Sequence, residues 1–349
     1  MRTFIRYWFI LLVMALAVAT VHSQDFPSRP VKIVVPQTPG GASDALARII
    51  GQKLSEKWNH PVVIENRPGA GGNIGMEAVA NAPADGHTLL MSYVGTHAIN
   101  GSLYKKLPFD PEKDFAPVAT LATLPLVMVV IVDAPFKTVP ELITAAKKSQ
   151  LAYGSAGNGS VNHLLGEMFN SAAGLKLVHV PYRGAAPAMQ DLMGGQINMV
   201  FTSLPSVSGA IKSGTLHPIA VTSLKRAASF SNIPTIAEAS FKDFDVNPWF
   251  GLFAPSKVPA NIVRKINADV NEILKSKEVT DKFVAQGAEP YLTNPQEFAA
   301  VLKADIAKWS QVIKSSGTSV DYTCDVATLR SAVAEWLPVQ TRMVSGWSR

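Results

Sequence analysis

Two glycine-rich loops near the start of the folded region carry the residue types that bind anions. The first glycine loop, Pro36–Asp44, follows the apolar run Val31–Val35, and the second glycine loop, Arg67–Gly75, follows Val62–Asn66. Each loop precedes a helical pattern, so free backbone N–H groups and the positive end of a helix dipole point to one place. Two such units on neighbouring parallel strands converge on one crevice, the usual ligand position in an open α/β sheet. The sequence therefore predicts an anion-binding cleft.

Polar residues that follow other expected strands extend this prediction to a carboxylate site. A carboxylate needs fixed donors, and backbone amides, hydroxyls, side-chain amides and an arginine supply them. Any single Ser or Asn here could equally form a turn or cap a helix, but so many polar loops at strand ends favour a site. Arg183 is the only charged candidate. The candidate ligand-binding residues are Thr38, Gly40, Gly41, Ser43, Gly71, Gly72, Asn73, Ser92, Thr96, His97, Ser155, Asn158, Ser160, Arg183, Thr202 and Ser203.

Other chemistries lack their residue patterns. Gly69, Gly71 and Gly75 miss the dinucleotide-binding spacing by one residue, and no phosphate-loop, nucleophile-elbow or HExxH zinc motif is present. The histidines after the first 23 residues have no metal spacing, although His97 and His163 lie beside expected cleft loops. The net charge of +6 is dispersed, which suits attraction of small anions and not nucleic acid. We therefore expect no catalytic residues, metal or cofactor.

The first 23 residues have the order of a secretory signal peptide. Arg2 and Arg6 precede the apolar run Trp8–Ala19, and small residues suitable for cleavage follow at Ala19 and Ser23. An uncleaved membrane anchor is the alternative, but the apolar run is shorter than the roughly 20 residues that span a bilayer. We expect export to the periplasm without stable membrane insertion.

The remaining pattern predicts two α/β domains joined by two crossings. Short apolar runs bounded by Gly, Pro and Asn are interpreted as strands buried on both faces. Ser43 or Asp44 is expected to cap the first helix, and Tyr104–Pro117 to form a surface loop. Crossings near Ala119–Leu124 and Asn247–Gly251 would form the hinge of a two-lobe ligand trap. The expected division is 1–23 signal peptide, 24–122 and 249–317 lobe 1, 123–248 lobe 2, and 318–349 an atypical tail.

Several ordered motifs, from about Phe26 to Gly317, resemble the Bug family. These proteins are the extracytoplasmic solute receptors of tripartite tricarboxylate transporters. The motifs are Pro36-x-x-Pro-Gly-Gly-Ala-Ser-Asp44, Glu65-Asn-Arg-Pro-Gly-Ala-Gly-Gly-Asn-Ile-Gly75, Asp85-Gly-His-Thr-Leu-Leu90, Gly95-Thr-His-Ala-Ile-Asn100, Tyr153-Gly-Ser-Ala-Gly-Asn-Gly-Ser160, His179-Val-Pro-Tyr-Arg-Gly-Ala-Ala-Pro187 and Trp249-Phe-Gly-Leu-Phe-Ala-Pro255.

The resemblance implies an α/β, two-lobe periplasmic-binding-protein (Venus flytrap) fold that closes on a small organic carboxylate. It implies that Thr38–Ser43 and Pro68–Asn73, within the two glycine loops, hold one carboxylate in lobe 1, partly through ordered waters. It also implies that Ser155–Ser160 and Tyr182–Ala185 select the rest of the solute. Membrane subunits of the transporter are the implied transient partners, and we expect a monomer. The alternative is a ligand-sensing periplasmic protein that reports to a signalling partner, and an enzyme is a third interpretation.

Three departures from the family pattern bear on function. Gln37-Thr38 occupies a place that is often Phe followed by a small residue or Pro, and Thr202-Ser203 stands where Asp-Asn is common. The missing acid argues against a ligand with an amino group. The tail after Gly317 extends past the usual end of relatives and includes Cys324 and the weakly helical stretch Ala327–Trp336. It is interpreted as appended sequence from a shifted frame or fusion, with an interaction tail or a disulfide-linked dimer as alternatives.

Overall fold

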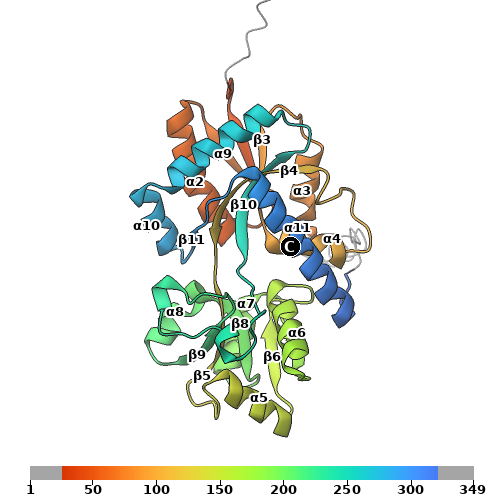
Figure 1. Ribbon diagram of the computed structural model, residues 1–349, viewed down its shortest axis with the longest axis vertical. Coiled ribbons are helices and arrows are strands. Elements are labelled where there is room, and N and C mark those ends of the chain that lie inside the picture. The colour runs from red at the N-terminus through yellow and green to blue at the C-terminus, as the bar shows by residue number, and fades with distance from the viewer. Residues whose placement is uncertain (1–25, 321–349) are drawn as a thin grey trace, which may run out of the picture.

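The structure, a computed structural model, describes residues 26–320. The expected signal peptide, its cleavage sites and the tail beyond Val320, with Cys324, lie outside the described residues. Within residues 26–320, no helix combines the length and the apolar character needed to cross a bilayer. Figure 1 shows two lobes, one above the other, each built on its own sheet.

The chain forms one six-stranded and one five-stranded sheet, and we define lobe 1 and lobe 2 by them. Lobe 1 contains β1 (Val31–Val35), β2 (Val62–Asn66), β3 (Thr88–Tyr93), β4 (Phe115–Thr123), β10 (Trp249–Pro255) and β11 (Glu289–Pro290), in the order β11-β4-β10-β3-β1-β2. Lobe 2 contains β5 (Leu126–Ile131), β6 (Ala152–Ser155), β7 (Val178–Pro181), β8 (Met199–Ser203) and β9 (Leu216–Val221), in the order β7-β6-β8-β5-β9.

Helices cover both sheets. In lobe 1 they are α2 (Ala42–Trp58), η1 (Ala70–Gly72), α3 (Asn73–Ala80), η2 (Gly95–Ile99), α4 (Asn100–Leu103), α9 (Ala260–Leu274), α10 (Lys277–Ala285) and α11 (Pro295–Ser316). In lobe 2 they are α5 (Val139–Lys148), α6 (Val161–Ala173), α7 (Ala185–Met193) and α8 (Leu204–Lys212), and the short turns η3 (Ala228–Phe230) and η4 (Ala237–Ala239) follow β9. In lobe 1, α2, α9 and α10 pack on one face of the sheet, and α3 and α11 on the other.

Strand direction brings the expected loops to common edges. β1 pairs in parallel with both β2 and β3, and β6 pairs in parallel with both β7 and β8. The carboxyl ends of each parallel set therefore lie at one edge of its sheet. β10 runs antiparallel to β3 and β4. The chain passes between the lobes after β4 and again before β10 (Figure 1). The predicted α/β two-lobe fold is confirmed.

Several helix starts follow from local sequence. The Ser160 hydroxyl accepts the N–H of His163 at the start of α6. Asn294 and Glu297 form a reciprocal capping box at the start of α11, whose first helical residue is a proline. Such caps satisfy amides that the first turn leaves without helical partners, and they fix where each helix begins.

Three local expectations are wrong. The N-cap of α2 is Gly41 with no side-chain cap, and Ser43 and Asp44 lie inside the first turn. β2 and β7 are edge strands with partly exposed residues, because a strand at a sheet edge has one open side. The loop expected to extend to Pro117 ends earlier, because β4 already begins at Phe115 against β10.

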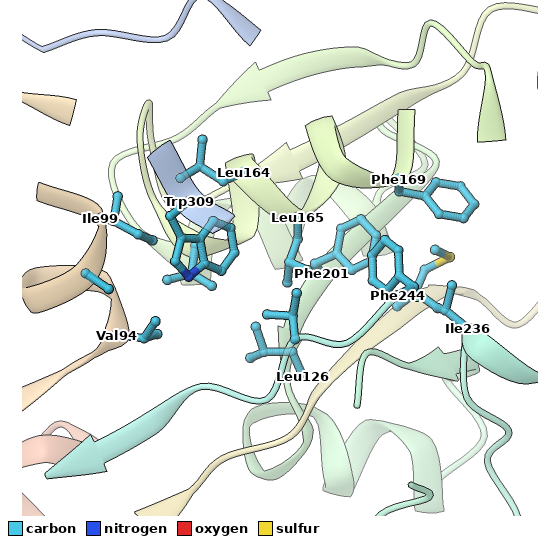
Figure 2. Packing of buried hydrophobic residues seen from close by; sticks show 14 of the residues in the cluster. Val94, Ile99, Leu126, Leu164, Leu165, Phe169, Phe201, Ile236, Phe244 and Trp309 are labelled. Atoms are coloured by element: carbon cyan, nitrogen blue, oxygen red, sulfur yellow. The ribbon is translucent and has the colours of Figure 1, made fainter. Parts of the chain in front are cut away.

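Helix α11 connects the two lobes by apolar packing. Figure 2 shows Trp309 of α11 between Val94 and Ile99, which follow β3, and Leu164 and Leu165 of α6. All five side chains are buried and belong to one continuous hydrophobic cluster. The carboxyl edge of the lobe 1 sheet therefore faces lobe 2.

Candidate functional site

The second glycine loop has an unusual backbone that only glycines adopt readily. Gly69, Ala70, Gly71 and Gly72 have φ values of 127°, 48°, 65° and 96° in succession. A Cβ at Gly72 would lie 2.6 Å from Cγ2 of Thr96. Left-handed backbone at several consecutive residues is strained for other residue types and is typical of functional loops. The loop is therefore held in one shape against the residues that follow β3.

The side chain of Asn100 holds the second glycine loop by hydrogen bonds. Its side-chain amide donates to the carbonyl of Gly71 at 3.0 Å and to Oδ1 of Asn73 at 2.7 Å. Because Oδ1 of Asn73 is used in this way, Nδ2 of Asn73 remains as a buried donor with no partner among the described residues. The Ser92 hydroxyl is also fully buried and has no partner there. Ser92 points to the side of the sheet that carries α3, since Leu90 two residues earlier packs in the same cluster as α3.

The first glycine loop already has a negative charge. Asp44 Oδ2 accepts the N–H of Gly40 at 3.0 Å, and Asp44 Oδ1 accepts from Asn66 at 3.0 Å. Partial burial of Asp44 opposes its ionisation, but hydrogen bonds from Arg48, Gly40 and Asn66 outweigh burial and lower the pKa of the carboxyl. The positive end of α2 is thus partly neutralised by Asp44. The first turn of α3 contains no acid, so its N-terminus is the better anion site.

A direct hydrogen bond connects the first loop with the residues after β3. Nε2 of Gln37 donates to the Thr96 hydroxyl at 2.9 Å, and Asn66 donates to the carbonyl of Gln37. Thr96 in turn contacts the Gly72 backbone. The structure therefore brings together Thr96, Gly72 and Asn73. Thr38, Gly40, Gly41 and Gly71 are exposed beside them, and Ser43 is buried at the start of α2.

In lobe 2 the corresponding loop follows β6, and we call residues 155–160 the lobe 2 loop. Ser155 Oγ accepts the N–H of Gly157 and lies 2.6 Å from Nε2 of His179. Ser160 Oγ donates to the carbonyl of Gly157 at 2.7 Å. The N–H of Gly159 donates to Nδ1 of His163 at 3.0 Å. Hydroxyls and imidazoles thus hold this loop, where side-chain amides and an ion pair hold the lobe 1 loops.

The other lobe 2 candidates lie at the ends of neighbouring strands. Arg183 is exposed between β7 and α7 and bonds no other described side chain or backbone group. Asn158 is exposed within the lobe 2 loop, and Thr202 is buried in β8. The Ser203 hydroxyl lies 2.6 Å from that of Ser206 at the start of α8. All four lie at or after the carboxyl ends of the parallel strands β6, β7 and β8, at one edge of the sheet.

The lobe 2 loop touches lobe 1. A Cβ at Gly159 would lie 2.5 Å from the Leu103 side chain of α4, so the backbone approaches lobe 1 closely there. Asn100 of the same helix holds the second glycine loop. The loop sets of the two lobes therefore meet across α4.

His97 is the candidate that the structure places elsewhere. Its ring is fully buried, stacks on Phe253 with centroids 3.8 Å apart, and meets Phe115 edge-on. Nε2–H donates to the carbonyl of Pro111 at 2.8 Å. Burial lowers the pKa of His97 to about 3, so the ring is neutral in the core of lobe 1. His97 is a packing residue in this arrangement, and its neighbour Thr96 faces the loops.

Two cavities lined by described residues lie away from the loops. One, of about 590 Å³, lies between α6 and α11, and another, of about 630 Å³, lies beside α4. Neither is lined by the glycine loops or the lobe 2 loop. The candidate site is therefore identified by hydrogen-bond geometry and strand topology, and not by a cavity.

Sequence reasoning missed the residues that hold the loops in place. Asn100, Asn66 and His179 make the decisive hydrogen bonds, and Asp44 was expected only as a cap. The sequence contains one signal for Asn100, since this residue stands four positions after Thr96 in the motif Gly95-Thr-His-Ala-Ile-Asn100. Nothing in the sequence alone pairs His179 with Ser155.

Comparison with known proteins agrees with the fold and the loops. The family described as "Tripartite tricarboxylate transporter family receptor" matches residues 46–318. Protein BugT of Bordetella pertussis is 34% identical over 305 residues, which are 86% of this chain and 94% of BugT.

Two solved relatives contain carboxylates. A protein of R. palustris with adipate is 38% identical, has a TM-score of 0.74, and is matched over 84% of this chain and 99% of its own. MatC from Rhodopseudomonas palustris with bound malate is 32% identical, has a TM-score of 0.70, and is matched over 82% of this chain and 100% of its own.

Proposed function

This chain belongs to the tripartite tricarboxylate transporter receptor family, and from this premise we propose that it captures a small organic carboxylate between its two lobes and delivers it to membrane subunits. One ligand per monomer is bound by the loops at the carboxyl ends of the parallel strands. Lobe 1 anchors one carboxylate, and the lobe 2 loop with Arg183 selects the remainder of the ligand.

The unpartnered donor of Asn73 is the observation that carries this proposal. Asn73 is the first residue of α3, is fully buried, and has its Nδ2 without a partner among the described residues. An unsatisfied buried donor costs about 1–3 kcal/mol, so a ligand that accepts from it recovers this cost. The adjoining left-handed loop and the positive end of α3 favour an anionic acceptor. A carboxylate oxygen fits both requirements.

The ligand class follows from charge and from relatives. The solved relatives described above hold adipate and malate, which are both dicarboxylates. Thr202 and Ser203 supply hydroxyls and no acid at the carboxyl end of β8, so a cationic amino group would find no negatively charged partner in these two residues. Arg183 suits a second carboxylate as a charged hydrogen-bond donor. We therefore favour an aliphatic dicarboxylate without an amino group.

A thermal-shift screen tests the ligand class. Adipate, malate, succinate and citrate are compared with neutral sugars and with amino acids. A ligand at 100 times its dissociation constant stabilises the folded protein by about 2.7 kcal/mol, which raises the melting temperature by several degrees. Stabilisation by sugars or cations but by no carboxylate would contradict the proposal.

A pair of isosteric variants tests the anchor. Asn73→Asp replaces the donor by a negative charge at the site, and we expect the affinity to fall by at least about 100-fold. Asn294→Asp makes the same charge change at the N-cap of α11, where Asp caps as well as Asn, and should leave affinity unchanged. Equal affinities for the two variants would place the ligand away from α3.

Delivery and location require a cellular test. Residues 1–23 are proposed to direct export to the periplasm, where a transporter of this type would receive the loaded receptor. Deleting the gene should abolish uptake of the identified carboxylate, and fractionation should recover the protein without the leader from the periplasm. Unchanged uptake, together with lost induction of a carboxylate-responsive gene, would favour the sensing alternative.

A further inference from the structure

Two histidines stack beneath the lobe 2 loop. The rings of His163 and His179 are 3.8 Å apart at an angle of 18°. His163 is buried in the first turn of α6, and His179 lies half-buried on β7. Each ring contacts a different part of the loop, since His179 meets Ser155 and His163 meets Gly159.

The bond from Gly159 fixes the protonation of His163. The backbone N–H of Gly159 points at Nδ1, so Nδ1 carries a lone pair and the single ring proton of the neutral form is on Nε2. A second proton on Nδ1 would place two donors face to face at 3.0 Å. The loop bond therefore exists only while His163 is neutral.

The other hydrogen bonds of the lobe 2 loop hold the neighbours of Gly159, Ser160 among them, and not the Gly159 amide itself. The N–H groups of Gly157 and Ser160 are used inside the loop by Ser155 and by the Gly157 carbonyl. The N–H groups of Ala156 and Asn158 bond no other described residue, so these two amides are the ones free to meet a ligand. Gly159 follows Asn158 directly in the loop, and its backbone also approaches Leu103 of lobe 1.

We propose that His163, stacked on His179, is a positioning residue for ligand capture: in its neutral form it holds the Gly159 amide and thereby orients the lobe 2 loop, and protonation of His163 releases the loop. This inference rests on the proposed function for its effect on ligand binding. The effect on the loop itself stands on the geometry of the pair.

The surroundings of the pair support a neutral state near neutral pH. Burial lowers the pKa of His163, although the nearby Glu167 carboxylate opposes this. Burial, followed by repulsion from His163, lowers the pKa of His179 to about 4. Two imidazolium rings in stacking contact repel each other, so the second protonation is strongly disfavoured.

The charged and titratable groups around the pair are few among the described residues. Glu167 of α6 lies 4.0 Å from Nε2 of His163 and accepts a hydrogen bond from the hydroxyl of Tyr153 on β6. Burial raises the pKa of Tyr153, so its hydroxyl stays protonated. Lys308 of α11 and Glu167 both line the cavity between α6 and α11. Lys176, which precedes β7, lines a further cavity that Glu167 also lines.

The expected acid response follows from linkage. Release of the loop opens the His163 ring to water, so the pKa of His163 rises back toward its ordinary range, whereas the bond from Gly159 in the ordered loop disfavours a proton on Nδ1. The equilibrium for ordering the loop should therefore weaken by up to about tenfold between pH 7.5 and pH 5.5. In the His163→Asn variant, Oδ1 would lie near the position of the histidine Nδ1 and could accept the same N–H. The amide side chain does not titrate.

The first test needs no ligand. Nitrogen NMR of wild-type protein at pH 7.5 should show His163 with a proton on Nε2 only. The hydrogen-exchange protection factor of the Gly159 amide should fall by up to about tenfold from pH 7.5 to pH 5.5 in wild type, and by less than about threefold in H163N. The matched control H217N replaces a lobe 2 histidine bonded to the Lys137 carbonyl and should behave as wild type. A proton on Nδ1 at pH 7.5, or equal pH responses in wild type and H163N, would overturn the inference.

The second test uses adipate as the probe in calorimetry of the full chain. At pH 7.5, H163A should bind adipate about tenfold more weakly than wild type, and H163N within about threefold. From pH 7.5 to pH 5.5, wild type should lose more affinity than H163N, which corrects for titration of adipate itself. Equal binding by H163A and wild type would exclude a positioning role. If wild type binds no carboxylate, the proposed function fails, and the NMR and exchange results still decide whether His163 holds the loop.

Discussion

The loops of lobe 1 and the loop of lobe 2 are held by different chemistry. In lobe 1, Asn100, Asn66 and the ionised pair of Asp44 with Arg48 fix the glycine loops. In lobe 2, the stacked pair His163 and His179 fixes residues 155–160. Amides do not titrate, and Asp44 stays ionised well below neutral pH, whereas these two imidazoles are neutral at neutral pH and take up protons as the solution is acidified.

This difference suggests a division of labour between the lobes. In the proposed function, lobe 1 supplies the anion site, in which the Asn73 donor has no partner among the described residues. In the inference drawn above, lobe 2 supplies a loop whose order depends on the charge of His163. A rigid anchor reduces the entropy cost of the first contact, and an adjustable second wall permits selection and release.

The largest expected effect comes from distorting the rigid site. Gly72→Ala places a methyl group 2.6 Å from Thr96 at a φ of 96°, which L-residues rarely adopt. We expect carboxylate affinity to fall by at least about 100-fold, because the loop must move by more than a hydrogen bond tolerates. Calorimetry measures this. The control is Gly174→Ala at the end of α6, where the glycine has a φ of 61° and a Cβ would meet no atom within 4 Å. This variant should add backbone strain and leave affinity unchanged.

Acid should weaken the fold through one histidine in each lobe. Burial lowers the pKa of His97 to about 3, and burial with repulsion from His163 lowers that of His179 to about 4. Below about pH 6.5 these two histidines bind protons in the unfolded chain but stay neutral in the folded protein. Their contribution to the free energy of unfolding is therefore fully present above about pH 6.5, and the free energy should fall by about 2–3 kcal/mol per histidine by about pH 4.5.

Urea denaturation at several pH values checks this prediction. His97→Phe and His179→Asn should each flatten the pH dependence, whatever they do to stability at pH 7.5. His217→Asn should not change the slope. An equally steep loss of stability in the His97→Phe and His179→Asn variants would show that carboxyl groups, and not these rings, govern the acid response.

Arg183 tests whether lobe 2 contributes charge as well as shape. Its guanidinium is exposed and bonds no other described residue, so Arg183→Ala should not change the melting temperature of the free protein. If Arg183 meets a ligand carboxylate, affinity should fall by about 1.5–3 kcal/mol, or roughly 10- to 100-fold. Arg183→Lys should recover part of this loss. Unchanged affinity in the alanine variant would limit anchoring to lobe 1.

The smallest effect is expected from removing the tail. Val320 donates its N–H to the carbonyl of Leu103, next to the α4 residues that support both loop sets. Truncation after Val320 retains this bond and should leave the melting temperature and affinity unchanged. Truncation after Gly317 removes the bond and should cost at most about 1 kcal/mol of stability. Loss of binding in the protein truncated after Val320 would show that residues 321–349 take part in the site.

Much of the fold was predictable because it depends on local signals. Short apolar runs beside glycine loops indicated the parallel strands, and reciprocal capping at Asn294 marks the start of α11. The errors arose where a neighbour decides the outcome. β2 and β7 have strand-like sequences, but only the sheet order makes them edges. His97 lies in a polar motif, and its ring is buried because Phe253 and Phe115 arrive from distant strands.

The sequence by itself determined that this protein has two α/β lobes with glycine loops after their parallel strands, and its motifs indicated the family. Those properties reside in runs of adjacent residues, where periodicity and backbone preference act locally. Only the tertiary structure decided which side chains hold the loops. The bond from Asn100 to Gly71 spans 29 positions and that from Ser155 to His179 spans 24. Hydrogen bonds of a few ångströms between such distant positions form only after the strands have paired, so the chain order alone does not specify them.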